Sequence, residues 1–240
     1  VDHLAELRSN MDCNDFNLLC YQQFSKYIKN SKVLKFIVES GNNTYELSRL
    51  LEMESSRWFG HAIKHFCMSF ENAMENNRNE VVGIINKNYP SIHESLKNYH
   101  DSFFLQHQNT IEQSRHQVRA YFRMMGDTIE SVYYPHIQCI YQIMTLDPSS
   151  KLYGRPLKVS NGKAVSELLQ ISEFYEPLSK NLENISLSQW RNISQHSSYS
   201  YDIKSEKIIC QYGNDSTVTI SLEDLVSLLQ RMNILQSLLK

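Results

Sequence analysis

The chain has 240 residues, enough to bury a sizeable core in one large domain or two small ones. Hydrophobic residues make up 41% of the chain and charged residues 21%, which is ordinary for a soluble globular protein. The formal net charge of −2 excludes a chain that is basic overall, so any nucleic-acid site has to come from a local patch.

Signals for membrane insertion or secretion are missing from the sequence. No apolar run approaches the roughly 20 residues that a membrane-spanning helix needs, and no basic, apolar leader precedes the first helix. The five cysteines are odd in number and scattered, with no Cys-x-x-Cys pair, as expected of reduced thiols. We therefore expect a cytoplasmic protein without a membrane partner. The start at Val1 rather than Met is what a fragment or processed piece would show.

The first 90 residues are predicted to be helical. Only 7 Gly and 5 Pro occur in the whole chain, which favours long helices over a turn-rich β fold. Apolar residues recur at spacings of three and four, typical of a buried helix face, in four segments: 16–40, 44–54, 55–77 and 80–90. We expect Pro90 to close this N-terminal helical region, 1–90, whose role the sequence does not indicate.

The next stretch, 91–146, predicts one or two long helices. Pro135 is expected to bend or divide it, because proline lacks the N–H that a helix interior needs. A linker follows at 147–162. The helical pattern then returns over 163–182, where Pro177 is expected to interrupt it.

In the C-terminal part, the spacing of the apolar residues changes from that of helices to that of strands. A short helix begins at Ser186 and runs into "RNISQH". The runs "KIICQYG" and "STVTISL", joined by Gly213-Asn214-Asp215, predict a β-hairpin, and Ser221 begins a closing amphipathic helix. The expected fold is mainly α: a helical bundle with a small β-hairpin before the last helix, plus the N-terminal helical region.

One pair of histidines has the spacing of a metal site. His61 and His65 lie one helical turn apart, and Cys67 is close in sequence. No glutamate stands in the His-Glu-x-x-His arrangement, and no third ligand follows. We therefore expect no metal, and interpret the two histidines as a packed or solvated pair.

Three arginines recur every four residues in the long helical stretch, at Arg115, Arg119 and Arg123. This spacing places them in one stripe, which could bind phosphates because arginine makes strong charge-assisted hydrogen bonds to them. The alternative is a solvated helix face. Phosphate-binding glycine loops, nucleophile elbows, and kinase and dinucleotide fingerprints are absent, which removes the commonest enzyme classes.

The segment "RNISQH" carries Arg191 and His196 at the expected end of a short helix. Ideal helix geometry rotates the two side chains about 140° apart, but they can converge on one phosphate if His196 lies where the helix ends. A guanidinium binds phosphate and a neutral imidazole moves a proton near pH 7, which together suffice for metal-independent RNA cleavage. The alternative is that both cations only complement the helix dipole.

The order of elements around this segment resembles the HEPN superfamily (higher eukaryotes and prokaryotes nucleotide-binding domains). The resemblance covers about 91–240, and its sharpest parts are "WRNISQHSSYSYD" and "TISLEDLVSLLQRM". The family motif is Arg, a polar residue that is often Asn, three to five further residues, and His, which Arg191, Asn192 and His196 match. The family implies a helical bundle that dimerises and brings two motifs into one cleft. Many members are ribonucleases of toxin–antitoxin, abortive-infection and antiviral systems.

The resemblance implies a role for each matched residue. His196 is expected to be the general acid and base, Arg191 the group that binds the phosphate and its transition state, and Asn192 an orienting residue. Ser197 and Tyr199 are second-tier candidates for lining the cleft, and the arginine stripe for binding substrate. Implied partners are RNA, a second copy of the chain, and an antitoxin or sensor protein, with no cofactor.

Two departures and two alternatives accompany this interpretation. Some toxin members carry a Tyr two residues after the His, as a target for adenylylation; here Ser198 holds that position and Tyr199 follows it. The first 90 residues lie outside the resemblance and are interpreted as a module that senses, recruits or inhibits. The alternatives are a non-catalytic HEPN-like module that binds nucleotide or RNA or mediates assembly, and a purely structural helical protein.

Overall fold

The computed structural model describes residues 57–108, 114–213 and 215–239, together with isolated positions between 18 and 35. Helices account for 69% of the described residues, which confirms the mainly α prediction. In chain order, the elements are α4 (Arg57–Gln108), α5 (Ser114–Thr128), the π-helix η2 (Ile129–Tyr133), α6 (Tyr134–Met144), α7 (Asn161–Leu168), α8 (Ser172–Leu178), the 3₁₀-helix η3 (Lys180–Leu182), α9 (Leu187–Gln195), β1 (Tyr199–Asp202), β2 (Lys207–Tyr212), β3 (Ser216–Ser221) and α10 (Leu222–Leu239).

The chain divides into two compact units, Val1–Arg57 with Lys240 and Trp58–Leu239. Only the second unit is described below. The helices predicted over 16–54 lie outside the described residues, apart from the isolated positions. The predicted domain boundary at residue 90 falls within α4 and stays a prediction.

Helix α4 consists of two helical segments that meet in a kink at Asn77, where the backbone leaves helical geometry (φ −139°, ψ 40°). The Asn77 side chain donates a 2.9 Å hydrogen bond to the carbonyl of Leu146, just beyond α6. Pro90 lies inside the second segment, so the helix predicted over 80–90 does not end there. Proline removes one helical hydrogen bond, but Ile84 and Ile92, on either side of it, both pack in an apolar cluster with α6 and hold the helix together.

Pro135 divides the next helical stretch, as predicted. It stands in the first turn of α6, directly after a wider turn in which the Tyr134 N–H donates to the carbonyl of Ile129, five residues earlier. The π-helix η2 precedes it and joins α5 to α6 without a loop. This join places Glu130 of η2 seven residues after Arg123, the last arginine of the stripe on α5.

The linker predicted at 147–162 corresponds to residues 145–160 between α6 and α7, and its first turn is packed rather than loose. Asp147 is fully buried and accepts 2.8 Å hydrogen bonds from the backbone N–H and the hydroxyl of Ser149. The Asn72 amide of α4 donates in turn to that hydroxyl, over 3.0 Å. Burial by itself would raise the pKa of Asp147, but the hydrogen bonds from Ser69, Ser149 and Asn72 outweigh it and hold the pKa below its ordinary value.

The helical pattern predicted over 163–182 forms α7, α8 and the short 3₁₀-helix η3, with a break between α7 and α8 that was not predicted. The break falls at Ile171, whose extended backbone (φ −100°, ψ 120°) precedes α8. Pro177 lies in the last turn of α8, where its missing N–H removes one bond near the end of a short helix. Helix α8 ends at Leu178, one residue after Pro177, and Ser179 leaves helical geometry (φ −149°, ψ −61°) before η3, so the predicted interruption is present in addition to the one at Ile171.

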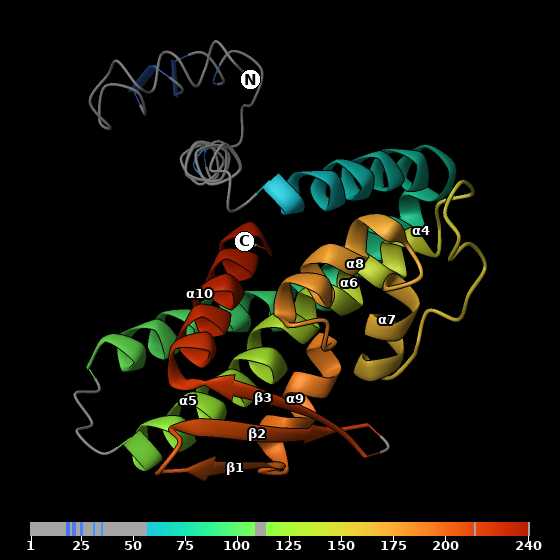
Figure 1. Ribbon diagram of the computed structural model, residues 1–240. Helices are drawn as coiled ribbons and strands as arrows, with labels where there is room; N and C mark the ends of the chain where they lie inside the picture. The colour runs from blue at the N-terminus through green and yellow to red at the C-terminus, as the bar shows by residue number, and fades with distance from the viewer. Residues whose placement is uncertain are drawn as a thin grey trace. The chain divides into compact units, whose positions relative to one another are not determined.

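The predicted hairpin is confirmed, and a third strand extends it. β2 and β3 pair antiparallel, with Ile208 opposite Ile220, and β1 pairs antiparallel with the other edge of β2. Figure 1 shows this sheet lying across one end of the helices, below α5 and α9. Ile208 and Cys210 of β2 are fully buried, whereas Ile209 between them is exposed, so one face of the sheet packs against the helices.

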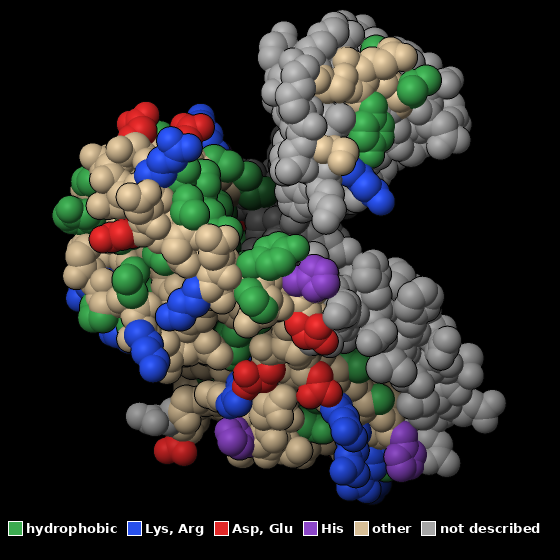
Figure 2. Space-filling view, turned by 180° about the vertical axis from the view of Figure 1, so that it is seen from behind, with side chains coloured by type: hydrophobic (Ala, Val, Ile, Leu, Met, Phe, Trp, Pro, Cys, Tyr) green, Lys and Arg blue, Asp and Glu red, His purple; other side chains and the backbone are tan. Residues whose placement is uncertain are grey.

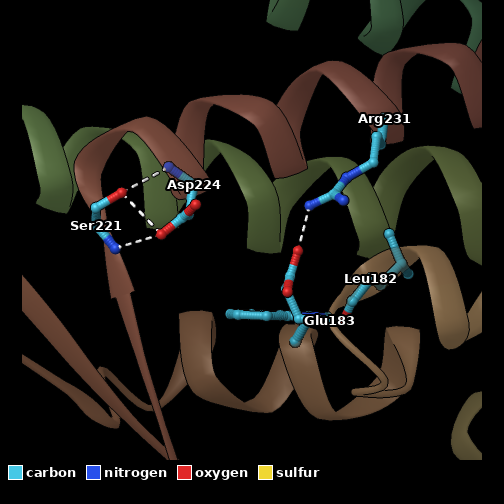
Figure 3. A network of polar contacts seen from close by, with 6 residues as sticks. Leu182, Glu183, Ser221, Asp224 and Arg231 are labelled. Atoms are coloured by element: carbon cyan, nitrogen blue, oxygen red, sulfur yellow. Dashed lines mark hydrogen bonds and ion pairs between the residues drawn. The ribbon is translucent and has the colours of Figure 1, made fainter.

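Helix α10 is fixed at its start and along its side (Figure 3). Ser221 and Asp224 form a reciprocal cap, in which the Asp224 N–H donates to the Ser221 hydroxyl and both the N–H and the hydroxyl of Ser221 donate to the Asp224 carboxylate. Two turns later, Arg231 donates to Glu183 over 2.5 Å. The pKa of Asp224 lies below its ordinary value because the Ser221 N–H and hydroxyl stabilise the carboxylate.

The core lies between α5, η2, α6, α7, α9 and α10. Its largest fully buried side chains include Phe122, Met125, Ile129, Tyr133, Tyr141, Leu168 and Trp190. Residues of α5, η2 and α9 are prominent among them, so the helix that carries "RNISQH" is part of the core of this unit.

Candidate functional site

Helix α9 is held by its buried side chains. Trp190 is fully buried, and its indole N–H donates a 2.8 Å hydrogen bond to the carbonyl of Leu182. Ile193 is also fully buried, and Ser186 starts the helix with a capping box that includes Gln189. With this face fixed, Asn192 and His196 are exposed on the remaining surface of the helix.

The crossing of α5 and α9 depends on a glycine. A Cβ built on Gly126 of α5 would lie 3.1 Å from Cβ of Ser194 and 2.9 Å from the amide nitrogen of Gln195. Gln195 can turn away, but Ser194 is buried and its hydroxyl donates to the carbonyl of Trp190, so it has little freedom. The absence of a side chain at Gly126 therefore allows the two backbones to approach.

The end of α9 places His196 at a turn. His196 is the C-cap, and its N–H donates to the carbonyl of Asn192 over 3.0 Å. Ser197 adopts a left-handed conformation (φ 52°), and Ser198 donates to the carbonyl of Ile193 over 2.9 Å. This is the Schellman pattern of helix termination. The helix therefore ends at the exposed His196. This end is the condition under which the side chains of Arg191 and His196 could reach one phosphate.

Arg191 contacts two side chains of the same chain. Its guanidinium donates to Oε1 of Glu130 in η2, and its Nη1 donates to Oδ1 of Asn192 over 3.1 Å. Both members of the ion pair are about one-third exposed, at 31% and 33%. Tyr134 lies beside them: burial raises its pKa to about 12, the Glu130 carboxylate adds to the rise, and the Arg191 charge opposes it.

An open cleft of about 540 Å³ lies where α9 meets the sheet. Asn192 and His196 line it from α9, and Tyr212 and Thr217 line it from the hairpin of β2 and β3. Among its described lining residues Arg191 does not appear, although Asn192 is bonded to Arg191. The cleft therefore brings together two of the three predicted catalytic residues, with the third at its side.

The second-tier candidates Ser197 and Tyr199 are not among the described residues that line this cleft, although Ser197 stands between two that do, His196 and Ser198. Tyr199 begins β1 and stacks on Phe122 of α5, with ring centroids 4.0 Å apart and planes 15° apart. Burial raises its pKa, while the nearby Arg119 charge and a hydrogen bond with Ser197 lower it. Within the stretch 197–199, Ser198 is the residue that belongs to the described lining of the cleft.

Comparison of the chain with protein-family models, with curated proteins and with solved structures finds no match in any of the three. No family is identified. The HEPN resemblance, with the roles that it implies for Arg191, Asn192 and His196, stays a prediction of the sequence.

The arginine stripe lies on the surface of α5. Arg115, Arg119 and Arg123 are all exposed, and Arg123 faces Asp127 at 3.9 Å, one turn further along. Figure 2 shows Lys and Arg side chains gathered at the lower edge of the molecule, over α5. The Arg119 charge reaches Tyr199, so the stripe passes beside β1.

The histidine pair of α4 does not form part of a metal cluster. Within the described part of the chain, no group of three or more His, Cys, Asp or Glu side chains could hold a metal ion. His65 instead faces Glu173 of α8, with Nδ1 3.7 Å from the carboxylate, and Cys67 is exposed. None of the helices described has both the length and the apolar character that crossing a membrane requires.

Sequence reasoning missed the acidic partner of Arg191 and the contribution of the hairpin. Glu130 stands 61 residues before Arg191, and no local pattern connects them. Gln211, Tyr212 and Thr217 enter the cleft because the Gln211 N–H bonds to the carbonyl of Ser198 and draws β2 alongside the end of α9. The short distance along the chain from His196 to the predicted hairpin is the signal that could have indicated this.

Proposed function

We propose that residues 91–240 act as a metal-independent endoribonuclease of the HEPN type, in a defence, toxin or stress-response system. The observation that supports this most is the cleft at the end of α9, which Asn192 and the exposed His196 line together while Arg191 is bonded to Asn192. A solvent-accessible imidazole and a guanidinium together suffice for RNA cleavage without a metal.

In the proposed mechanism, the ribose 2′-oxygen attacks the neighbouring phosphorus as the bond to the 5′-oxygen breaks. His196 takes the 2′-hydroxyl proton or delivers a proton to the leaving oxygen. Arg191 binds the phosphate and stabilises the charge of the phosphorane, and Asn192 orients Arg191 through their hydrogen bond. The products are a 2′,3′-cyclic phosphate and a 5′-hydroxyl.

The active form in this proposal is a homodimer. Within one chain, Arg191 is turned toward Glu130 of η2, whereas His196 lies on the cleft beside the hairpin. One chain therefore offers few groups to a single phosphate, and a second copy supplies the complementary residues. A protein that is monomeric at micromolar concentration and still cuts RNA normally would contradict this part.

The arginine stripe of α5 is the proposed track for the RNA backbone. Its three side chains are exposed, and α5 crosses α9 at Gly126, so bound phosphates would lead toward the end of α9. We place the activity in the cytoplasm, with an antitoxin or sensor protein as a further partner and residues 1–90 as the segment that receives its signal.

A cleavage assay tests the proposal. Labelled RNA is incubated in EDTA with the wild type, with Arg191→Ala and with His196→Ala, and the cut ends are analysed for cyclic phosphate. Arg78→Ala and His61→Ala remove exposed side chains of the same types from α4 and serve as matched controls. The expected result is cleavage by the wild type and both controls and loss in both test variants. A substrate with a 2′-deoxyribose at the cut site should remain intact.

One observation favours a non-catalytic module as the second candidate. Arg191 is already paired with Glu130, which is also what a purely structural ion pair would show. In that case RNA or a nucleotide binds without being cut, or the domain only mediates assembly. RNA that stays intact with every variant, although Arg119→Ala weakens its binding, would favour the module over the enzyme.

A further inference from the structure

The connector between α6 and α7, residues 145–160, is positively charged in a chain whose net charge is −2. The stretch 148–166 contains four Lys or Arg residues and no Asp or Glu. Three of these cations and two large apolar side chains are exposed on the connector. We call these five residues the connector surface: Lys151, Tyr153, Arg155, Leu157 and Lys158. Tyr153 is 56% exposed and Leu157 43%, so both apolar side chains are available to a partner.

The connector is fixed to α6 from its inner side. Leu152 is fully buried, and the Tyr141 hydroxyl of α6 donates a 3.2 Å hydrogen bond to the carbonyl of Pro156. The Gln138 amide, also of α6, donates to the carbonyl of Val159 over 3.2 Å. Figure 1 shows the connector extending beside α7. Because its backbone is already held, a partner that binds the outer side chains does not have to order a loose loop first.

The positive charge next to the connector is only partly neutralised. Nε of Arg155 lies 3.9 Å from the carboxylate of Glu167 in α7, and Nζ of Lys163 lies 2.7 Å from the same carboxylate. Glu167 is buried, so one inward carboxylate faces two cations. The side chains of Arg155 and Lys163 nevertheless remain more than half exposed. An anionic partner can therefore reach the excess positive charge.

An open groove of about 340 Å³ lies along one side of the connector surface. Leu157 and Lys158 line it from the connector, and Gly83 and Lys87 line it from α4. A Cβ added at Gly83 would meet nothing within 4 Å, so this part of α4 is open to a partner. Glu80 is the one acidic residue among the described lining residues, against two lysines. Cations thus lie on both sides of a groove, which a chain-like polyanion can enter and a flat bilayer cannot.

Exposed cations together with an exposed aromatic ring are typical of surfaces that bind single-stranded nucleic acid, where cations bind phosphates and rings stack on bases. We propose that the connector surface binds single-stranded RNA, with its three cations on phosphates and Tyr153 stacked on a base. Every base offers a flat face for stacking, so this binding is tolerant of RNA sequence. The inference rests on the proposed function for its choice of RNA. It adds a second contact site, which shares no described residue with the α9 cleft.

Fluorescence anisotropy with a labelled oligouridylate of about 16 nucleotides tests the aromatic contact. All variants carry His196→Ala, so that the RNA is not cut during the measurement. Tyr153→Ala should lower the affinity at least about fivefold, and Tyr153→Phe should leave it unchanged because the ring remains. Tyr175→Ala removes an exposed tyrosine from α8 and is the matched control. Equal affinity of Tyr153→Ala and the control would overturn the proposal.

The salt dependence of binding tests the phosphate contacts. Lys158→Gln should make the slope of log K against log salt shallower by about 0.7, the value for one phosphate of a single strand. Lys158→Arg keeps the charge and should keep the slope. Lys64→Gln removes an exposed lysine from α4 and should also leave the slope unchanged. The wild-type slope in Lys158→Gln would overturn the proposal.

Further outcomes separate this inference from a membrane site and from the proposed function. If vesicles of phosphatidylcholine and phosphatidylserine bind the wild type but not Tyr153→Ala, while RNA affinity is unchanged, the surface is a membrane site and the proposal is overturned. If the wild type cuts RNA and every connector variant binds it normally, this inference fails and the ribonuclease stands. If the connector variants bind RNA more weakly but the wild type cuts none, the ribonuclease fails and this inference stands.

Discussion

Arg191 and Glu130 form an ion pair that joins α9 to the π-helix η2, with Nε and Nη2 of the arginine both directed at the same carboxylate oxygen. The pair connects the residue proposed to bind phosphate with η2, the element that follows α5 in the chain. Because both side chains remain about one-third exposed, a phosphate group can reach the guanidinium and compete with the carboxylate. Arg191 is thus occupied but accessible.

Replacing Glu130→Gln should strengthen RNA binding. The substitution keeps the side-chain shape but removes the charge that competes with phosphate. Partly exposed ion pairs contribute about 0.2–1 kcal/mol, so we expect a gain of about 1.4- to fivefold in affinity, measured by fluorescence anisotropy.

The control for this variant is Glu176→Gln, which removes the charge from a surface pair with Lys180 on another helix and should leave affinity unchanged. If Glu130→Gln instead lowers cleavage as far as Arg191→Ala does, the carboxylate positions the guanidinium rather than competing with the substrate.

Replacing Arg119→Ala should weaken RNA binding uniformly across RNA sequences. An exposed arginine that contacts one phosphate adds counterion release but reads no base, so the slope of log K against log salt should become shallower by about one unit or slightly less. Binding titrations at several salt concentrations measure this slope. Arg78→Ala on α4 is the matched control and should not change it; an equal change in both variants would mean that α5 has no special role.

Replacing Gly126→Ala should destabilise the unit by about 1–3 kcal/mol, since a new Cβ would press on Cβ of Ser194 in the packed crossing of α5 and α9. Urea unfolding measures the difference. Gly83 is the control, because it lies inside α4 and a Cβ added there would have nothing within 4 Å. Gly83→Ala should stabilise the protein by about 0.4–1 kcal/mol. Destabilisation by both variants would show a general intolerance rather than a close approach.

The elements that follow a local pattern could be predicted from the sequence. The hairpin of β2 and β3 follows from two alternating runs around a Gly-containing turn, and the end of α9 near His196 from its position before that hairpin. Strand β1 could not be predicted because "YSYD" is short and polar, and it forms by pairing with β2, with Tyr199 opposite Cys210. The segment forms a strand because it pairs with β2, and not because its own residues favour a strand.

Features that depend on tertiary packing could not be predicted. Proline propensity placed a helix end at Pro90, but the apolar face of α4 packs against α6 on both sides of it. Gly126 lies close to Ser194, and Glu130 is paired with Arg191. Both contacts join residues that are more than sixty positions apart in the chain. The Nε2 atom of His136, buried with no partner among the described residues, is likewise invisible in "YPHIQCIY", where the histidine reads as one polar residue on an apolar helix.

The stability of the unit should fall in acid as Asp147 is protonated. Its folded-state pKa lies below its ordinary value of 3.8, so the hydrogen bonds from Ser69, Asn72 and Ser149 contribute fully above about pH 4. This contribution is lost as the pH falls through the lowered folded-state value. Replacing Asp147→Asn should cost about 1–3 kcal/mol in urea unfolding at pH 7. The difference from the wild type should shrink below pH 4; a difference that stays constant down to pH 2 would show that the charge of Asp147 contributes nothing.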